Sequence, residues 1–360
     1  MKVLLTGSAG FIGQHVLREL LVRGHEVRAL DSLRGDVHAN PAWTPPAGVT
    51  FERADVRDGA ALDRFLAGVD TVLHLAAKVG LGVDVQDLPD YASSNDVGTA
   101  VLLAAMARAG VRRLTLASSM VVYGEGLGLC TKHGAITPAP RTQAALSAGQ
   151  FEPPCPHCGE PLATALVSED TLLDPRNAYA SSKVAQEFYA ANWARVTGGS
   201  VAAMRYHNVY GPGMPRDTPY AGVAAIFTSA LKRGEAPKVF EDGKQRRDFV
   251  HVRDVAAATV LACEQHVSGV RAYNVGSGTP RTVGDMARAL AKALNGPEPI
   301  VTGYYRLGDV RHITADSSRL RDELNWRPQV KFDDGMSELA TGQLPLQLGN
   351  PDLSLARSGD

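Results

Sequence analysis

The sequence predicts an α/β fold: a doubly wound parallel sheet, a smaller C-terminal α/β lobe and a cysteine-bearing insertion. Three observations lead to this prediction. Short apolar strands alternate with amphipathic helices in the first half of the chain, and a glycine-rich turn directly follows the first strand. The alternation then breaks between Tyr123 and Tyr179, where three of the four cysteines lie. Alternating strands and helices imply a parallel sheet with helices on both faces.

The elements follow from the spacing of apolar residues. Strands are expected at 2–6, 27–30, 49–53, 69–74, 113–117, 201–205 and 272–275, and helices at 11–23, 58–66, 95–109, 179–195, 221–233 and 283–294. Residues 1–205 form the expected first domain, with the insertion at about 126–168. Residues 206–345 form mainly the second lobe, with a return to the sheet at about 248–278, and 346–360 are a tail.

Composition narrows the class of protein. The chain has 360 residues, which suits one large or two closely merged domains. Its net charge of −1 gives no reason to expect binding to nucleic acid or to a membrane surface. No apolar stretch is long enough to span a bilayer, and the N-terminus runs directly into a strand without a leader. We therefore expect a cytoplasmic protein.

The glycine-rich turn predicts a dinucleotide site. Gly7, Gly10 and Gly13 follow a strand and open a helix, which matches a Rossmann-type turn that holds a pyrophosphate at the helix N-terminus. Asp31, at the end of the second strand, offers a carboxylate to a ribose diol. A plain tight turn with a solvated Asp31 is the less favoured alternative. The acid favours NAD over NADP, although the nearby Arg34 leaves NADP open.

Further residues are assigned to the cofactor site by their position. Asp55, at a strand end, is expected either to reach the adenine or to cap the next helix. Lys78 is expected either to contact the substrate or to face solvent. The remaining cofactor assignments beside the glycines and Asp31 are Phe11, Ile12, Ser32, Val56, Leu75, Ala76 and Ala77.

A second motif predicts the chemistry. Tyr179 and Lys183 lie four residues apart, on one face of an expected helix. A lysine cation beside a phenol, close to a positive nicotinamide, is expected to lower the tyrosine pKa toward neutrality. Tyr179 then accepts a proton from a sugar hydroxyl and returns it in the reverse direction. Lys183 is expected to hydrogen-bond the nicotinamide ribose as well.

The end of the fifth strand carries a resemblance to a known family. The run Ser119-Met120-Val121-Val122-Tyr123-Gly124, with the glycine turn and the Tyr179 motif, resembles extended short-chain dehydrogenases/reductases of the nucleotide-sugar epimerase and dehydratase type. The resemblance implies that Ser119 is the catalytic hydroxyl; Ser118 is the alternative. The related 4,6-dehydratases carry an Asp-Glu pair where Met120 and Val121 stand, and decarboxylating relatives carry a glutamate at the second position. Both activities are therefore disfavoured.

The same resemblance implies a set of residues beyond the catalytic ones. Arg205-Tyr206-His207-Asn208 matches a family segment, with His207 near the nicotinamide and Asn208 on the substrate diphosphate, although a structural role for His207 is favoured from the sequence. Paired arginines suit a diphosphate. The further implied positions are Asn95 on the cofactor and Val239, Arg247, Arg306 and Asp309 on the substrate.

The cysteine-bearing insertion has the spacing of a small zinc knuckle. Cys130-x-x-His133 is followed, after a gap of 21 residues, by Cys155-x-x-Cys158. We expect a closed structural zinc site, with His157 as an alternative to His133 and three reduced cysteines in a loop as the metal-free alternative. Within the family, the insertion and the Val79-Gly80-Leu81-Gly82 run resemble those of dTDP-L-rhamnose 4-epimerase-like proteins.

These features together predict an NAD-dependent 4-epimerase. The expected substrate is a nucleoside-diphosphate sugar of the dTDP or UDP type, oxidised at C4 and reduced again on the other face by the same hydride. A net 4-ketoreductase or dehydrogenase with exchangeable cofactor is the alternative, and a non-catalytic NAD-binding scaffold is the least favoured. Relatives usually dimerise through the helices that correspond to 95–109 and 179–195, so a homodimer is expected.

Overall fold

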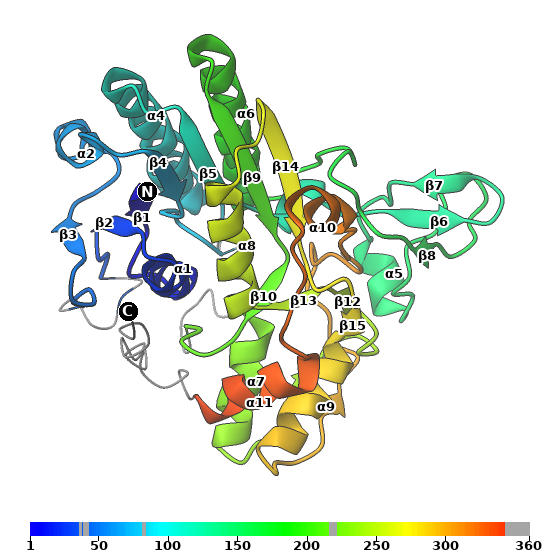
Figure 1. Cartoon of the computed structure of the whole chain (residues 1–360). Coiled ribbons are helices and arrows are strands. Elements are labelled where there is room, and N and C mark those ends of the chain that lie inside the picture. Colours follow the sequence, from blue (N-terminus) through cyan, green and yellow to red (C-terminus); the bar gives the residue numbers. More distant parts are fainter. Residues whose placement is uncertain (36–37, 39–42, 81–83, 216–221, 343–360) are drawn as a thin grey trace, which may run out of the picture.

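The computed structural model of the chain has a central parallel sheet with a smaller lobe below it and an arm at one side (Figure 1). It describes residues 1–35, 38, 43–80, 84–215 and 222–342. The expected tail at 346–360 and the residues Leu81 and Gly82 lie outside this part of the chain. Among the described residues, no helix has both the length and the apolar character needed to cross a membrane.

The central sheet has seven strands in the order β14-β9-β5-β4-β1-β2-β3, and every neighbouring pair is parallel. This order reverses direction between β1 and β4, as in doubly wound dinucleotide-binding folds. All seven expected strands are present, with ends shifted by one to two residues. They are β1 (Lys2–Thr6), β2 (Glu26–Asp31), β3 (Thr50–Arg53), β4 (Thr71–His74), β5 (Arg113–Ser119), β9 (Ser200–Tyr206) and β14 (Val270–Val275).

Helices cover both faces of the sheet, so alternate strand residues are buried on opposite sides. Leu4 packs in one core cluster with α2 (Gly59–Leu66), α4 (Gly98–Ala109) and α6 (Ala178–Thr197). Val3 and Leu5 face the other cluster, with α1 (Phe11–Val22) and α8 (Val252–Glu264). The helix expected at 95–109 begins later, at Gly98 (α4), because residues 95–97 belong to a π-helical turn at Ala92–Val97. Two further short helical turns precede it, Val85–Asp87 and α3 (Leu88–Tyr91).

The smaller lobe packs three helices around its own apolar core, which includes Phe227, Leu290 and Leu339. The helices are α7 (Val223–Lys232), α9 (Val283–Ala293) and α11 (Phe332–Thr341). Short strand pairs join this lobe to the sheet: β10 (Asn208–Tyr210) with β13 (Phe249–His251), β11 (Lys238–Val239) with β16 (Ile300–Val301), and β12 (Arg246–Arg247) with β15 (Arg281–Thr282). The helix α10 (Ser318–Leu324) packs on β14.

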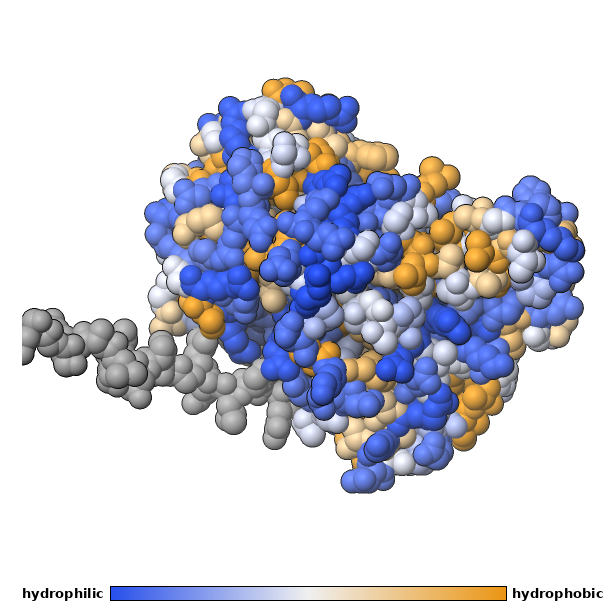
Figure 2. All heavy atoms as spheres, turned by 45° about the vertical axis from the view of Figure 1, so that its right-hand side comes forward, coloured by the Kyte–Doolittle hydropathy of each residue, from blue (hydrophilic) through white to orange (hydrophobic). Residues whose placement is uncertain are grey.

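The insertion forms the arm at the right of Figure 1. It follows a 3₁₀ turn at Met120–Tyr123 and contains a three-stranded antiparallel sheet and one short helix. Its elements are β6 (Gly128–Cys130), β7 (Gly134–Ile136), α5 (Gln143–Ser147) and β8 (Ala163–Thr164). On the face of the molecule in Figure 2, hydrophilic and hydrophobic residues are interspersed over both the arm and the body.

Candidate functional site

The candidate site lies at the carboxyl ends of the parallel strands, because register brings those ends to one edge of the sheet. Thr6 of β1 is level with Leu30 of β2 and His74 of β4, and Ser119 of β5 is level with Tyr206 of β9. Open α/β sheets bind their ligands along this edge, at the point where the strand order reverses. The glycine turn, Asp31 and Ser119 all follow or end these strands.

The glycine turn can accept only glycine at two of its three positions. A Cβ on Gly7, whose φ is +70°, would lie 2.6 Å from the Ala76 nitrogen, and one on Gly13 would lie 1.9 Å from the Gly7 oxygen. The helix α1 begins at Phe11, and no side chain caps its N-terminus. The first amides of α1, which include those of Phe11 and Ile12, are thus available to an anion, and the arrangement fits a pyrophosphate.

Asp31 ties the glycine turn to the end of β2. Its buried carboxylate accepts hydrogen bonds from the amides of Ala9 and Leu33, each at 2.9 Å. These bonds hold the glycine turn and the backbone at Ser32 in place. Arg34 points its guanidinium to Asp90, with two bonds of 2.9 Å. Arg34 is therefore engaged by an acid, an arrangement that favours a free ribose diol over a 2′-phosphate.

Asp55 is not the helix cap that one alternative predicted. Asp58 caps α2 instead, by accepting from the amides of Ala60 and Ala61. The Asp55 carboxylate accepts from the side chain and amide of Arg57, and these bonds hold the pKa of Asp55 below its usual value although burial opposes them. Val56 is buried beneath α4.

Asn95 holds the loop after β4 in place and links it to the helix α6. Asn95 is fully buried; its oxygen accepts from the Lys78 amide, and its nitrogen donates to the Lys78 carbonyl and to the Ser182 hydroxyl. The amides of the preceding residues Leu75 and Ala76 donate hydrogen bonds to Thr6, and Ala77 follows them in the same loop. Lys78 does not simply face solvent: its ammonium contacts Asp87 and Asp90, at 3.3 and 2.8 Å.

A buried network of hydrogen-bonded polar side chains around His74 was not predicted from the sequence. The His74 ring bonds to the hydroxyls of Thr6 (2.8 Å) and Thr99 (3.0 Å), and Thr99 also accepts from Gln186 of α6 (2.6 Å). Burial, with a smaller effect of Lys183, lowers the pKa of His74 to about 3, so the ring is neutral. The network links β1, β4, α4 and α6. The polar residues are far apart in the sequence, so no local signal marks it.

Tyr179 and Lys183 lie one turn apart on α6, which begins behind the capping residue Asn177. The Lys183 ammonium lies 5.8 Å from the centre of the Tyr179 ring and donates to the carbonyl of Ala117, at 2.8 Å. Ser119 ends β5 close to the same phenol and contributes to its hydrogen bonding. The structure therefore brings together the three residues expected to carry the reaction.

The protein residues alone do not lower the pKa of Tyr179, and the expected lowering beside a bound nicotinamide stays a prediction. Burial raises the pKa of Tyr179 to about 12, Ser119 opposes this rise and Tyr91 adds to it. Lys183 bonds to a backbone carbonyl rather than to the phenol, so its charge does not offset the burial. Burial also lowers the pKa of Lys183 to about 8, against the opposing effect of Glu187.

Ser118 belongs to a buried network rather than to the reacting edge. Its hydroxyl donates to Glu187 at 2.5 Å, and Glu187 forms a two-bond ion pair with Arg205. Arg205 also donates to the Tyr123 hydroxyl, at 2.8 Å. Tyr179, Lys183 and Glu187 recur every four residues along α6, and that spacing is the signal that could have identified Glu187 from the sequence.

His207 and Asn208 leave β9 at the same edge. His207 is buried, burial lowers its pKa against the effect of Asp248, and neither ring nitrogen forms a well-oriented hydrogen bond with the described residues. The buried side-chain oxygen of Asn208 likewise has no partner among them. Buried polar atoms are normally paired, so this corner of the site has free hydrogen-bonding capacity.

The remaining residues expected to contact the substrate lie on the smaller lobe. Arg247 donates to the carbonyls of Val310 (2.6 Å) and Arg311 (2.9 Å), and burial lowers its pKa to about 10, so it stays charged at neutral pH. Burial raises the pKa of Asp309, and the nearby charges of Arg306 and Arg247 oppose the rise. Val239 is fully buried in the lobe core, so its side chain offers no exposed surface to a ligand.

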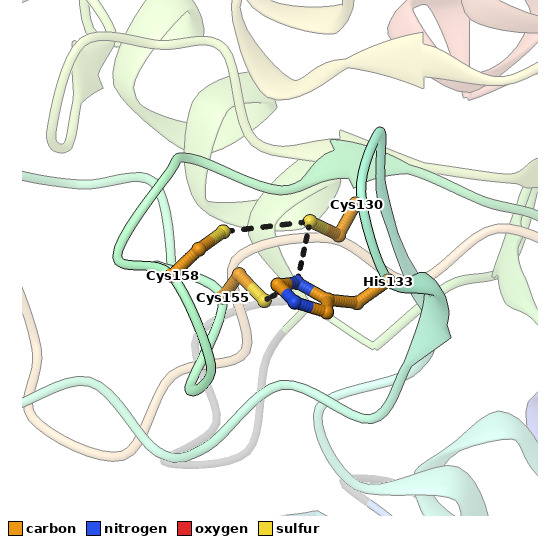
Figure 3. Close-up of side chains that lie close together, drawn as sticks. All are labelled: Cys130, His133, Cys155 and Cys158. Carbon is orange, nitrogen blue, oxygen red and sulfur yellow. Dashed lines mark hydrogen bonds between the residues drawn. The ribbon is translucent and has the colours of Figure 1, made fainter.

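The cysteine cluster has the dimensions of a tetrahedral metal site (Figure 3). The ligand atoms of Cys130, His133, Cys155 and Cys158 all lie within 4.8 Å of one another. The Cys130 and Cys158 sulfurs are 3.7 Å apart, and the His133 Nδ1 lies 3.4 and 3.5 Å from the sulfurs of Cys130 and Cys155. With Zn–S of about 2.3 Å and Zn–N of about 2.05 Å, tetrahedral edges are about 3.8 and 3.6 Å.

The histidine in the cluster is His133 rather than the alternative, His157. His157 is exposed and its ring lies tilted beside that of His133, with ring centres 5.1 Å apart, but it is not among the converging ligands. Burial opposes ionisation of Cys130, but hydrogen bonds from the Lys132 backbone and from His133 outweigh it and lower the Cys130 pKa to about 6. Three thiols and one imidazole are a donor set suited to Zn²⁺.

Comparison with known proteins places this geometry in a family. The sequence profile of the NAD dependent epimerase/dehydratase family matches residues 3–276. The chain is 34% identical to the dTDP-L-rhamnose 4-epimerase of Burkholderia thailandensis (94% of each chain) and 34% identical to the UDP-glucose 4-epimerase of Mycolicibacterium smegmatis (94% of this chain, 97% of the other). The chain therefore belongs to the NAD-dependent epimerase/dehydratase family.

Solved structures agree with this assignment. The UDP-glucose 4-epimerase of Thermotoga maritima with UDP-glucose superimposes with a TM-score of 0.77 at 28% identity, covering 95% of this chain and 98% of that one. The Thermus thermophilus UDP-glucose 4-epimerase in complex with NAD gives a TM-score of 0.75 at 29% identity, over 95% and 98%. The resemblance expected from the sequence is thus confirmed, together with the fold class.

Proposed function

We propose that the chain is an NAD-dependent epimerase that inverts C4 of a nucleoside-diphosphate sugar of the dTDP or UDP type. The observation that carries this proposal is the grouping of Ser119, Tyr179 and Lys183 at the sheet edge, beside a glycine turn that fits a pyrophosphate. The curated relatives named above are 4-epimerases of dTDP and UDP sugars, which supports the substrate class.

The residues of the chain divide the work. The bound cofactor supplies a hydride acceptor and donor. Tyr179 takes the proton of the C4 hydroxyl as the hydride leaves. It returns the proton after the bound 4-keto sugar has rotated to present its other face. Ser119 hydrogen-bonds the reacting oxygen. The side chains of Met120 and Val121, which follow Ser119, can neither donate nor accept a proton, so these positions offer no acid or base for eliminating water.

The protein residues alone leave Tyr179 too basic to act as a proton acceptor at neutral pH, because burial dominates its pKa. A positive nicotinamide ring near the phenol favours the phenolate, as does a Lys183 ammonium that turns from the Ala117 carbonyl toward the site. The reaction therefore depends on the loaded enzyme. In this assignment the cofactor is lined by the glycines, Asp31, Asp55, Asn95 and His207. The substrate-side assignments are Lys78, Asn208, Arg247, Arg306 and Asp309. Val239 is withdrawn from them, because its side chain is buried in the lobe core.

The decisive experiment screens UDP and dTDP sugars for interconversion without added cofactor. NAD released by denaturing the purified protein should be stoichiometric, because an epimerase returns its own hydride. Little retained NAD and steady turnover of added NADH would instead identify a net ketoreductase. Tyr179→Phe should lose at least about 100-fold in turnover and keep its NAD, because general acid–base catalysis contributes that much. Tyr189→Phe, at an exposed position of the same helix, is the matched control; full activity in Tyr179→Phe would refute the mechanism.

We also propose that the cysteine cluster holds a structural Zn²⁺, on the basis of its tetrahedral spacing. Metal analysis should give one zinc for each chain, and Cys155→Ser should lose it. Wild-type protein that is fully folded and contains no zinc as purified, before any chelator is added, would overturn the assignment. Three unpaired cysteines close together suit a reducing compartment, so we keep the cytoplasm as the expected location.

A homodimer through α4 and α6 is a further part of the proposal. These helices pack against each other (Figure 1). Exposed apolar side chains are Val97, at the N-cap of α4, and Phe188, Tyr189 and Val196 on α6. A second copy that presents the same face would bury this apolar patch. Light scattering should report a dimer for wild type and a monomer for Phe188→Asp; a wild-type monomer would contradict the proposal.

A further inference from the structure

The insertion meets the smaller lobe through a group of charges centred on the buried side chains of Arg311 and Glu241. Arg311, with a side chain 1% exposed, lies among three carboxylates. Its guanidinium contacts Glu152 of the insertion at 2.5 Å, and it contacts Glu241 at 2.8 Å and Asp242 at 2.7 and 2.9 Å, both on the turn after β11. Glu152 also bonds to His312 at 2.8 Å. Arg311 and His312 bring the pKa of Glu152 to about 2 although burial opposes them, so the carboxylate is charged.

The insertion contributes a second buried cation to the same group. The Arg141 side chain is 3% exposed and donates to Glu241 at 2.8 Å and to the carbonyl of Asp309 at 2.6 Å. Glu241 is thus shared between Arg141 and Arg311. Because a buried charge is stable only with its partners, the insertion and the loop that carries Asp309 and Arg311 constrain each other.

That loop, which we call the diphosphate loop, carries Arg306, expected to contact the substrate phosphate, and Asp309, expected to contact a ribose or sugar hydroxyl. From the smaller lobe, Arg247 donates hydrogen bonds to the loop carbonyls of Val310 and Arg311. From the insertion, Arg141 donates to the loop carbonyl of Asp309. The charges of Arg306, Arg247 and Arg141 all act on the Asp309 carboxyl, so these groups lie close together. The position of the loop therefore depends on both neighbours.

The cysteine cluster closes the segment that bears Arg141 and Glu152. Cys130 and His133 precede these residues and Cys155 and Cys158 follow them, so a bound metal would join the two ends of the segment. The insertion has little apolar core of its own: Leu162 and Ile136 pack directly on the cysteines. A unit this small needs a staple to hold its shape.

We propose that the insertion is a wall of the nucleotide-sugar site, and that metal at Cys130, His133, Cys155 and Cys158 sets substrate affinity by holding Arg141 and Glu152 on the diphosphate loop. Arg141 and Glu152 are positioning residues, since they act through Asp309 and Arg311. The inference rests on the proposed function for the nature of the ligand. It assigns to the metal a role in binding, separate from the hydride and proton transfers at Tyr179.

The test measures binding and turnover separately on the full-length, NAD-loaded protein. Dissociation constants of UDP and dTDP are determined by calorimetry for wild type, Arg141→Gln, Arg141→Lys and Glu152→Gln, each with and without prior removal of metal by a chelator. The exposed insertion residues Lys132→Gln and Glu160→Gln lose the same charges and serve as controls. KM and kcat are measured for the sugar nucleotide that the wild type converts.

Arg141→Gln, Glu152→Gln and metal-free wild type should each bind the nucleotide about tenfold more weakly, a typical coupling between sites, with KM raised likewise. Their kcat and NAD content should stay within about twofold of wild type, which a general loss of folding would not allow. Arg141→Lys should recover part of the affinity, because it keeps the charge. Metal removal from Arg141→Gln should add little, because both changes release the same loop.

Three results would overturn the inference. One is unchanged nucleotide affinity in folded Arg141→Gln or in metal-free wild type. The second is a loss of kcat with unchanged KM. The third is an independent tenfold loss when the metal is removed from Arg141→Gln. A wild type that binds neither UDP nor dTDP overturns this inference and the substrate class together, whereas one that binds them but converts no sugar overturns only the proposed reaction.

Discussion

Gly13 offers the sharpest test of the cofactor site, because its neighbours leave no room for a side chain. A Cβ at this position would lie 1.9 Å from the Gly7 oxygen and 2.9 Å from the Gly7 carbon, both backbone atoms. Real Cβ atoms do not come closer than 3.0 Å, so Gly13→Ala forces α1 and the turn apart by about 1.1 Å. Overpacking of this kind typically costs about 1–3 kcal/mol, which the higher helix propensity of alanine offsets by about 0.5–1 kcal/mol.

The expected result is a protein that folds, with a modest loss of stability, but that no longer retains NAD. Opening the turn withdraws the first amides of α1 from the pyrophosphate that they are placed to bind. Gly59→Ala, at the first position of α2, is the matched control, because a Cβ there meets nothing closer than the Val101 side chain at 3.7 Å. NAD is quantified after denaturation, and unfolding is followed by melting. Stoichiometric NAD in Gly13→Ala, equal to Gly59→Ala, would refute the reasoning.

Two further predictions concern buried charges. Burial lowers the pKa of Lys183 to about 8, so the ammonium form is present below that pH and is lost above it; kcat should fall as pH rises through about 8, and Lys183→Arg should flatten this decline because a guanidinium stays charged. A decline that persists unchanged in Lys183→Arg would contradict the assignment. Arg205→Met should destabilise the fold by about 3–5 kcal/mol, because Glu187 then remains buried without its cation. Urea unfolding measures the loss of stability, with Arg195→Met at an exposed position as the control. An equal loss of stability in both variants would contradict the prediction.

The sheet was predictable because each strand carries its own signal. A strand buried on both faces reads as a short apolar run, as in Lys2–Thr6 and Val201–Arg205, and the alternation with helices then defines the parallel order. The region between Tyr91 and Gly98 was less well predicted. There a π-helical turn precedes α4 and places Asn95 against Lys78, a local distortion that apolar periodicity does not reveal.

The site residues were predictable only where short motifs define them. Gly7, Gly13 and the Tyr179–Lys183 pair lie in fixed local geometry, which a sequence pattern can capture. The pKa of Tyr179 was not predictable, because it depends on how deeply the tertiary fold buries the phenol and on where the Lys183 ammonium points. The spacing predicted which side chains lie together, and the lowered pKa of Tyr179 in the cofactor-loaded enzyme stays a prediction.

The charges around Arg311 show why some functional contacts escape sequence reasoning entirely. Glu152, Glu241 and Arg311 come from three segments far apart along the chain, and each alone resembles an ordinary surface charge. Their meaning comes from burial: a guanidinium 1% exposed requires anionic partners, and those partners must come from segments that the fold holds together. An insertion that supplies one of these anions is thereby tied to the loop beneath it. Under our proposal, a metal staple in such an insertion would act on the substrate loop through these charge contacts, without touching the reacting atoms.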